Sequence, residues 1–466
     1  MSEDFARLPG HVVAAGVRAG HLKAEAVTAA VLARIERLNP TLNAFTLVSA
    51  DRALREAAAV DAAVAAGADP GPLAGVPYSV KNLFDLAGEV TLAGSKINRD
   101  HPPAARDATV VSRLRAAGAV CVGATNMGEY AYDFVTVNAH YGATRNPHDT
   151  TRSAGGSSGG SGAAVAAGLG VFSLGSDTNG SVRVPGAFCG VWGLKPAYGR
   201  LTRAGAFLFA GSLDTVGVLG RDVGDLAAAF DAMAGPDPRD PVCAEDALAS
   251  LANGLDGGLG PARIAALDGY FARGWIPEVA AAMAAVTEAL GVTARLELPR
   301  PEIARAAAYA ITGTEGGEFH RARLMARAAD FDPAARDRFI AGALAPAAWY
   351  LQAQRFRAWW KAQMAEVFAR ADILIAPATP MVAPKLEDAT FVYDGMEMPL
   401  RPNIGLFTQP ITLIGLPVVA APVHAAGSLP TAVQLIGRPG SEGLLLRAAK
   451  VLEASGVCAA PVVEPD

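Results

Sequence analysis

The run SAGGSSGGSG at residues 153–162 decides the fold, because it places five glycines and four serines in ten residues just before an expected helix. A loop of this composition can expose backbone N–H groups and hold hydroxyls near a helix N-terminus. A second tract, GSDTNGSVR at 175–183, follows an apolar strand-like segment and places Ser181 24 residues beyond Ser157. The second tract, coming so soon, disfavours a flexible linker.

Two other functions of the first tract are also disfavoured. A phosphate cradle would require the pattern G-x-x-x-x-G-K-[ST], and no lysine follows these glycines. The tract satisfies G-x-S-x-G with Ser157 at its centre, but that nucleophile turn requires a strand directly before it. Residues 146–150 are instead expected to form a polar loop.

Helical and strand-like patterns alternate around these tracts, which predicts an α/β fold with helices covering a sheet. Apolar residues spaced by three and four predict a helix over 21–38, ended by Asn39-Pro40, and a second helix over 50–66. Residues 75–81 are expected to form a short buried strand that carries Lys81 at its end. Further elements are expected at 110–117 (helix), 119–123 (strand), 163–167 (helix) and 171–174 (strand).

The chain is expected to form one continuous domain with four parts. Residues 1–72 supply helices that pack on the core, and residues 73–244 form the catalytic core. Residues 245–345, rich in Ala and charged side chains with a helical pattern over 277–290, predict a helix-rich subdomain. Residues 346–466 return to strands at 372–377 and 415–420, which are expected to rejoin the first sheet.

Composition narrows the class of function. A net charge of -5 and a pI near 5.9 disfavour binding to nucleic acid. The N-terminal residues lack a signal-peptide pattern, and the apolar stretch 406–423 is interrupted by Gln409 and three prolines, so neither secretion nor a membrane span is expected. The four cysteines have no metal-ligand spacing. We therefore expect a cytoplasmic protein without a metal or cofactor.

Lys81 is the candidate base for a serine nucleophile. A serine hydroxyl attacks poorly until a neighbouring base accepts its proton, and a lysine amine is a base only when burial lowers its pKa and leaves it neutral. Apolar neighbours consistent with such burial are Val76, Val80, Leu83 and Phe84. A lysine that merely ends a strand is the alternative.

Histidine is not required by this scheme. Of the seven scattered histidines, His140 and His148 are expected in turns or at the surface. A histidine-based serine triad that uses His320 or His424 remains a second alternative.

Three features together resemble the amidase-signature family: Lys81 at the end of a Val-Pro-x-x-Val-Lys strand, the Gly-Gly-Ser-Ser-Gly-Gly-Ser loop, and Asp-x-x-Gly-Ser-x-Arg at this interval. The resemblance covers nearly the whole chain, including residues 125–127, 187–190, 193–196 and 372–380. It implies an amidase-signature fold, in which helices cover both faces of a large, mixed, twisted β-sheet and a helix-rich subdomain is attached.

The resemblance also implies the roles of the site residues. Ser181 attacks the amide carbonyl, Ser157 relays the proton through a cis peptide bond, and Lys81 is the base. Asp177 and Ser158 are expected to brace the loops. The expected donors to the oxyanion are the backbone N–H groups of Thr178, Asn179, Gly180 and Ser181.

Asn179 departs from the family pattern, which has glycine at this position. Its side chain is expected to narrow the pocket or to hydrogen-bond the substrate.

The helix over 349–357 resembles the segment that, in glutamine- and allophanate-using relatives, points an arginine at the substrate carboxylate. Arg357 matches that arginine, and a guanidinium can bind a carboxylate through two parallel hydrogen bonds. Met127 and Tyr350 are further expected substrate contacts. An ordinary surface arginine is the alternative for Arg357. Glutamine-using relatives also carry an acidic residue for the substrate ammonium where this chain has Gly405.

Within the family, residues 82–85, 92–99, 176–181 and 349–357 most resemble members that release ammonia from 1-carboxybiuret in cyanuric acid degradation. The expected reaction converts 1-carboxybiuret to urea-1,3-dicarboxylate. The expected partner is a small helical accessory subunit resembling the C subunit of the tRNA amidotransferase, in a heterotetramer, with a homodimer as the other expected assembly.

Three alternatives stay open: the glutaminase component of an Asp/Glu-tRNA amidotransferase, another small-amide enzyme such as an allophanate or biuret hydrolase, and a catalytically silent scaffold. Gly405 and Asn179 count against the glutaminase. Intact Lys81, Ser157 and Ser181 count against the scaffold.

Overall fold

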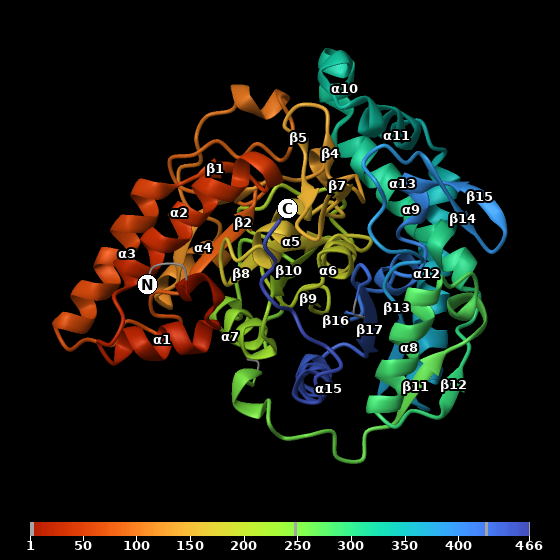
Figure 1. Ribbon diagram of the computed structural model, residues 1–466. Coiled ribbons are helices and arrows are strands. Elements are labelled where there is room, and N and C mark those ends of the chain that lie inside the picture. Colours follow the sequence, from red (N-terminus) through yellow and green to blue (C-terminus); the bar gives the residue numbers. More distant parts are fainter. Residues whose placement is uncertain (1–3, 247–248, 425–426, 466) are drawn as a thin grey trace.

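The computed structural model describes residues 4–246, 249–424 and 427–465, which form an α/β fold around one large sheet (Figure 1). Within these residues the sheet has eleven strands in the order β1-β3-β2-β8-β10-β9-β16-β17-β13-β11-β12. The strands are β1 Phe45–Val48, β2 Pro77–Lys81, β3 Val120–Thr125, β8 Phe172–Asp177, β9 Trp192–Lys195, β10 Thr215–Gly220, β11 Ile264–Leu267, β12 Ala294–Leu296, β13 Ile373–Pro377, β16 Val418–Val423 and β17 Thr431–Gly437.

The sheet is mixed, as the sequence predicts. Strand β2 pairs in parallel with β3 and β8, and β11 pairs in parallel with β12 and β13. The pairs between these groups, from β8 to β13, are antiparallel. Strands β16 and β17 lie between β9 and β13, so the prediction that the last strands rejoin the first sheet is confirmed.

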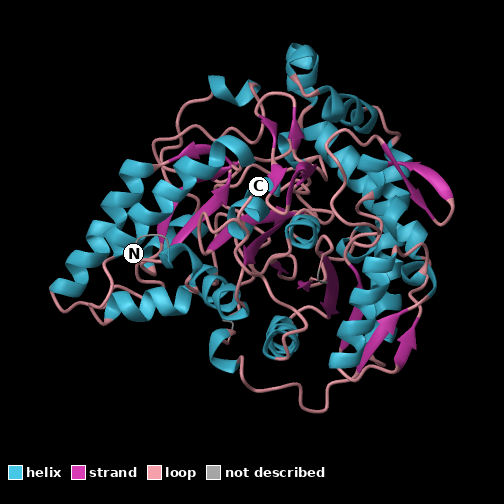
Figure 2. Ribbon diagram, in the orientation of Figure 1, coloured by secondary structure: helices cyan, strands magenta, loops and turns pink. Residues whose placement is uncertain are grey.

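Helices flank both faces of the sheet (Figure 2). They are α1 Gly10–Arg18, α2 Ala24–Leu42, α3 Ala50–Ala65, α4 Thr109–Ala116, α5 Gly159–Ala166, α6 Arg183–Cys189, α7 Val223–Met233, α8 Pro277–Ala289, α9 Pro301–Phe319, α10 Arg321–Arg327, α11 Pro333–Ala343, α12 Ala347–Phe368, α13 Leu400–Asn403, α14 Gln409–Thr412 and α15 Glu442–Ala454. Three hairpins lie outside the sheet: β4 Val137–Asn138 with β5 Gly142–Ala143, β6 Arg145–Asn146 with β7 Asp149–Ser153, and β14 Thr390–Tyr393 with β15 Met396–Pro399.

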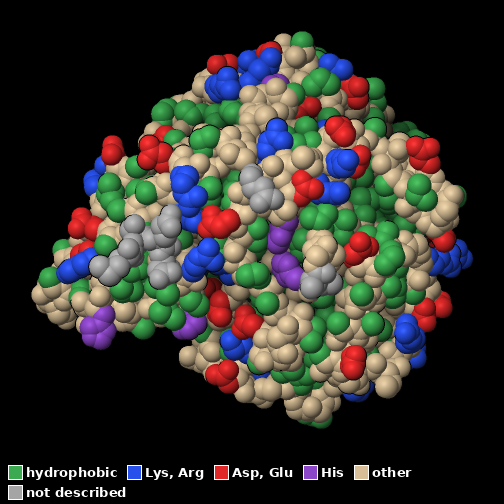
Figure 3. Space-filling view, viewed as in Figure 1, with side chains coloured by type: hydrophobic (Ala, Val, Ile, Leu, Met, Phe, Trp, Pro, Cys, Tyr) green, Lys and Arg blue, Asp and Glu red, His purple; other side chains and the backbone are tan. Residues whose placement is uncertain are grey.

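Among the described residues, no helix is both long and apolar enough to cross a lipid bilayer. Figure 3 shows acidic and basic side chains interspersed over the viewed face of the molecule.

Helix α2 follows the predicted apolar spacing but continues beyond its predicted end. Its buried apolar face includes Val27, Val31, Ile35, Leu38 and Leu42. The expected end at Asn39-Pro40 is wrong, because the helix continues through Pro40 to Leu42. The missing N–H of Pro40 costs this last turn one backbone hydrogen bond. Burial of Leu42 favours the extra turn, and left-handed Asn43 closes it by donating its N–H to the Asn39 carbonyl.

Helix α5 begins at Gly159, earlier than the expected start at residue 163. A Cβ on Gly160 would lie 2.4 Å from the Ala44 carbonyl oxygen, so the helix approaches neighbouring backbone too closely for a side chain. This packing overrides the low helix propensity of glycine. Glycine in the first tract therefore allows the helix to pack closely against neighbouring backbone, and it does not indicate a flexible segment.

The prediction of a polar loop at 146–150 is wrong, because these residues belong to the β6–β7 hairpin. The Asn146 amide stabilises the turn by donating to the Ser153 carbonyl at 3.2 Å and the Phe188 carbonyl at 2.7 Å. The hairpin is separate from the main sheet. Ser157 therefore does not follow a strand of the main sheet, as a nucleophile turn would require.

Residues 245–345 contain α8, α9, α10 and α11, and they also supply β11 and β12 at one edge of the main sheet. The described residues form three hydrophobic clusters, one of which includes residues from Val13 to Ala460. The first strand lies at the opposite edge, so the two edges are built from distant parts of the chain (Figure 1). The four-part division of the chain remains a proposal.

Candidate active site

Lys81 ends strand β2, which lies between β3 and β8 and is buried along its whole length. The side chain has no exposed surface. Its Nζ lies 2.7 Å from the Ser157 Oγ and 2.9 Å from the Ser176 Oγ. The position of β2 in the sheet therefore places the Lys81 amine within hydrogen-bonding distance of the Ser157 hydroxyl in the first glycine-rich tract.

Burial lowers the pKa of Lys81 from its usual value near 10.5 to about 7. The carboxylates of Asp214 and Asp177 act in the opposite direction and limit the fall. An amine with this pKa is largely neutral above pH 7, and a neutral amine can accept a proton from Ser157.

The first tract presents Ser157 after a cis peptide bond between Gly156 and Ser157. The Ser157 carbonyl accepts hydrogen bonds from the Gly128 N–H at 3.2 Å and the Thr136 hydroxyl at 3.4 Å. These contacts fix the backbone that carries the hydroxyl.

Ser158 joins the two tracts. Its N–H donates to the Ser181 carbonyl at 3.3 Å, while its hydroxyl accepts from the Ser176 N–H and donates to the Ser176 carbonyl, each at 3.3 Å. The two serine-bearing turns therefore lie directly side by side, and Ser181 itself is 3% exposed.

Asp177 makes several hydrogen bonds within the second tract. Its carboxylate accepts the N–H groups of Gly180 at 2.7 Å and Val182 at 3.2 Å, and it pairs with the guanidinium of Arg183 through two bonds of 2.9 Å. Burial alone would raise the pKa of Asp177, but the charge and hydrogen bonds of Arg183 hold it below its usual value. The remaining Arg183 donors bind the Thr408 carbonyl, the Gln434 amide oxygen and the Thr412 hydroxyl.

The expected oxyanion donors need one correction. The Gly180 N–H already donates to Asp177, so it is not available to a substrate oxygen. The N–H groups of Thr178, Asn179 and Ser181 remain as candidates. Glycine is required at 180 because φ is +138° and a Cβ would lie 2.3 Å from the Thr408 hydroxyl oxygen.

Two of the expected substrate-binding residues, Tyr350 and Arg357, bond neighbouring groups beside α9. Arg357 donates to the Ser212 carbonyl at 3.0 Å, and Tyr350 donates to Glu315 at 3.0 Å. Glu315 of α9 in turn accepts the N–H and the hydroxyl of Ser212. Arg357 and Tyr350 therefore lie close together. The hydrogen bond to the Ser212 carbonyl uses only one N–H group of the Arg357 guanidinium.

Met127 lies elsewhere, buried beside the Ser157 loop. Its exposed fraction is 1%, and the next residue, Gly128, donates to Ser157.

Two residues of the site, Ser176 and Asp214, are not predicted as functional groups from the sequence. Ser176 stands in the quoted second tract, and its strand position next to β2 explains its contact with Lys81. Asp214 has no sequence signal: it accepts the Thr178 hydroxyl at 2.6 Å and the N–H groups of Phe209 and Ala210. Burial raises the pKa of Asp214 to about 6.

Neither candidate histidine bonds a serine of the site. His320 is fully buried among aromatic rings, with the Tyr130 ring 4.0 Å away, and burial lowers its pKa to about 3. The His424 ring nitrogen bonds the Gly190 carbonyl. The structure therefore gives no support to a histidine triad.

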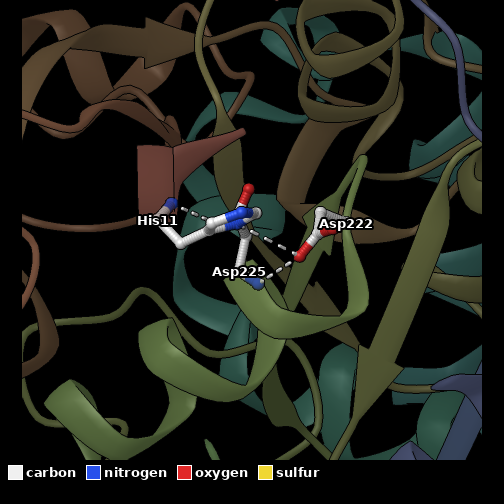
Figure 4. A group of neighbouring side chains, drawn as sticks. All are labelled: His11, Asp222 and Asp225. Carbon is white, nitrogen blue, oxygen red and sulfur yellow. Dashed lines mark hydrogen bonds and ion pairs between the residues drawn. The ribbon is translucent and has the colours of Figure 1, made fainter. Parts of the chain in front are cut away.

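His11, Asp222 and Asp225 form a group whose composition could suit a cation (Figure 4). Asp225 accepts the N–H groups of Gly10 and His11 at the start of α1, and Asp222 accepts the Asp225 N–H at the start of α7. The two bonds to Asp225 attach α1 to α7, and the bond to Asp222 caps the N-terminus of α7.

The pKa of Lys81 predicts the pH dependence of activity. The base must be neutral, so protonation below pH 7 removes it and activity rises with pH through this region. We expect kcat/KM to fall about 10-fold per pH unit below an apparent pKa near 7, and Lys81→Met to lower activity at least about 1000-fold. Initial rates between pH 5 and 9 measure both effects.

Lys195→Met is the matched control. Burial also lowers the pKa of Lys195 to about 7, but its Nζ bonds the Pro196 carbonyl rather than a serine. The acid limb should persist in this variant. A limb that disappears in Lys195→Met, or a flat wild-type profile, would contradict the assignment to Lys81.

Known proteins resemble this chain over almost its whole length. The family model described as amidase matches residues 26–446. The chain is 50% identical over 444 residues to AtzE, a component of the 1-carboxybiuret hydrolase of Pseudomonas sp. (strain ADP), covering 95% of this chain and 97% of that protein. It is 38% identical over 461 residues to the GatA-type component of the glutamyl-tRNA(Gln) amidotransferase of Moorella thermoacetica, covering 93% of each.

Solved structures extend the likeness to the fold. One, described as an unexpected vestigial protein complex that reveals the evolutionary origins of an s-triazine catabolic enzyme, superposes with a TM-score of 0.96 at 49% identity and covers 97% of this chain and 99% of that one. Another, described as an amidase, has a TM-score of 0.86 at 29% identity and covers 96% of this chain and 100% of that one. The chain therefore belongs to the amidase family.

Proposed function

We propose that this protein hydrolyses 1-carboxybiuret to urea-1,3-dicarboxylate and ammonia. The observation that carries amide hydrolysis is the 2.7 Å contact between the buried Lys81 amine and Ser157, in a loop bonded to the backbone of Ser181. The choice of substrate is supported by 50% identity to a component of a 1-carboxybiuret hydrolase.

The proposed reaction uses the three groups in the order Lys81, Ser157 and Ser181. Neutral Lys81 takes the Ser157 proton while Ser157 takes the Ser181 proton, and the Ser181 oxygen attacks the terminal amide carbonyl. Backbone N–H groups of the second tract stabilise the oxyanion. The proton returns through Ser157 to the leaving nitrogen, and the C–N bond breaks to release ammonia. Water, activated by the same base, then hydrolyses the Ser181 ester.

Arg357 is proposed to bind the substrate carboxylate. Its guanidinium uses one hydrogen bond on the Ser212 carbonyl, which leaves donors for a carboxylate. Burial lowers the pKa of Arg357, although an arginine remains charged. A bound carboxylate would offset the desolvation of this cation.

The substrate is proposed to lack an α-amino group. A Cβ on Gly405 would lie 2.6 Å from the Phe134 ring, so no acidic side chain fits where glutamine-using relatives bind an ammonium. The glutaminase function suggested by the 38% identical amidotransferase component is therefore the weaker candidate. Biuret and allophanate remain alternative small substrates.

We also propose that the chain works with a small helical accessory subunit, in a heterotetramer, or alone as a homodimer. A structural neighbour at 49% identity is described as part of a protein complex. A cytoplasmic location is proposed as well, since the four cysteines are free, which suits a reducing compartment.

Ammonia release tests the proposed function directly. We expect the wild type to release ammonia from freshly generated 1-carboxybiuret much faster than from glutamine, and Ser181→Ala to release none above background. Turnover by Ser181→Ala equal to that of the wild type would reject Ser181 as the nucleophile. Faster turnover of glutamine than of 1-carboxybiuret would favour the glutaminase.

Arg357→Ala tests carboxylate binding. The variant should raise KM about 100-fold for 1-carboxybiuret but less than about 3-fold for neutral biuret, because a charge-assisted bidentate contact is lost only with the carboxylated substrate. Arg355→Ala, which removes an exposed arginine from the same helix, is the control and should change neither value. Equal increases for both substrates in Arg357→Ala would remove Arg357 from the binding site.

A further inference from the structure

Asn179 holds a buried amide two residues before Ser181. The residue is 6% exposed, and its backbone carbonyl accepts the Thr408 hydroxyl at 2.6 Å. Its side-chain Nδ2 donates to the Thr312 hydroxyl oxygen of α9 at 3.4 Å. The side chain is thus held between the catalytic tract and α9.

The orientation of this amide follows from its partner. The Thr312 hydroxyl donates its own proton to the Ala308 carbonyl at 2.8 Å, so its oxygen can only accept from Asn179. The amide nitrogen must therefore face Thr312, and the amide oxygen faces the other way. Among the described residues, none donates a hydrogen bond to the buried Asn179 Oδ1.

The unpaired Asn179 Oδ1, close in sequence to the nucleophile Ser181, requires a hydrogen-bond donor. A buried amide oxygen is costly unless an N–H or O–H group reaches it. Asparagine supplies this acceptor without a charge, whereas an aspartate would place a negative charge beside the developing oxyanion. The chemistry therefore suits a neutral substrate N–H near the reacting carbonyl.

We propose that Asn179 is a specificity-determining residue whose Oδ1 accepts a hydrogen bond from the N–H that flanks the scissile carbonyl of a urea-type amide. This inference rests on the proposed function and refines its substrate class. 1-Carboxybiuret and biuret both carry such an N–H. Glutaramate and malonamide have the same chain lengths as 1-carboxybiuret and biuret but carry a methylene at that position, so they leave the acceptor unpaired.

The test compares each N–H substrate with its methylene counterpart. Ammonia release gives kcat/KM for 1-carboxybiuret against glutaramate and for biuret against malonamide, and competitive inhibition constants serve for any amide that binds without turnover. In the wild type the N–H member should be preferred. Asn179→Leu, close in shape, and Asn179→Ala should each reduce that preference about 10-fold, mainly by weakening use of the N–H member.

Asn403→Leu is the matched control. Asn403 is also a buried amide, but its Oδ1 already accepts from Arg305 and its Nδ2 donates to the Pro399 carbonyl. This variant should leave the preference within about 3-fold of the wild type.

Two results would overturn the proposal: an equal loss for both members of a pair in the Asn179 variants, which indicates a role in holding the loop, or an unchanged preference. Absence of wild-type activity on 1-carboxybiuret would instead reject the proposed substrate. The biuret and malonamide pair would still test Asn179, because neither compound carries a carboxylate.

Discussion

The structure depends on keeping one amine out of water. Lys81 has a pKa near 7 because no part of its side chain is exposed, and a charged amine at that depth loses its hydration. Parallel pairing of β2 with β3 and β8 places the end of the strand in the interior. The serine tracts supply the polar contacts that make such burial tolerable, and the same contacts carry the proton.

The second tract is held by a buried ion pair. Arg183 and Asp177 are both fully buried, and a pair of this kind stabilises only when every donor and acceptor is satisfied. The five Arg183 donors meet that condition by binding Asp177 twice and three groups from the segments 408–412 and 434. The loop that carries Ser181 is therefore anchored to residues of the C-terminal third of the chain.

Local patterns predict the elements that carry their own signal. The strand ending in Lys81, the two tracts and the apolar face of α2 depend on residues near in sequence, and the structure contains all of them. The start of α5 and the end of α2 could not be predicted, because contacts of Gly160 and Leu42 with distant residues override local propensity. Asp214 directly precedes β10, and Thr312 lies in α9. Both are distant in sequence from the serine tracts, so their place in the site is evident only in the folded chain. The sequence suggests Gly180 as an oxyanion donor because its N–H lies in the right tract, while the bond to Asp177 is visible only in three dimensions.

The proposed mechanism requires that Lys81 is uncharged near neutral pH. Direct titration of the lysine side-chain carbons by NMR measures this, with ¹³C-labelled lysine in the Lys195→Met protein so that the other buried lysine is silent. If Lys81 is the base, one resonance should titrate with an apparent pKa near 7 and disappear in Lys81→Met. A Lys81 resonance that stays in its charged form up to pH 10 would exclude Lys81 as the base.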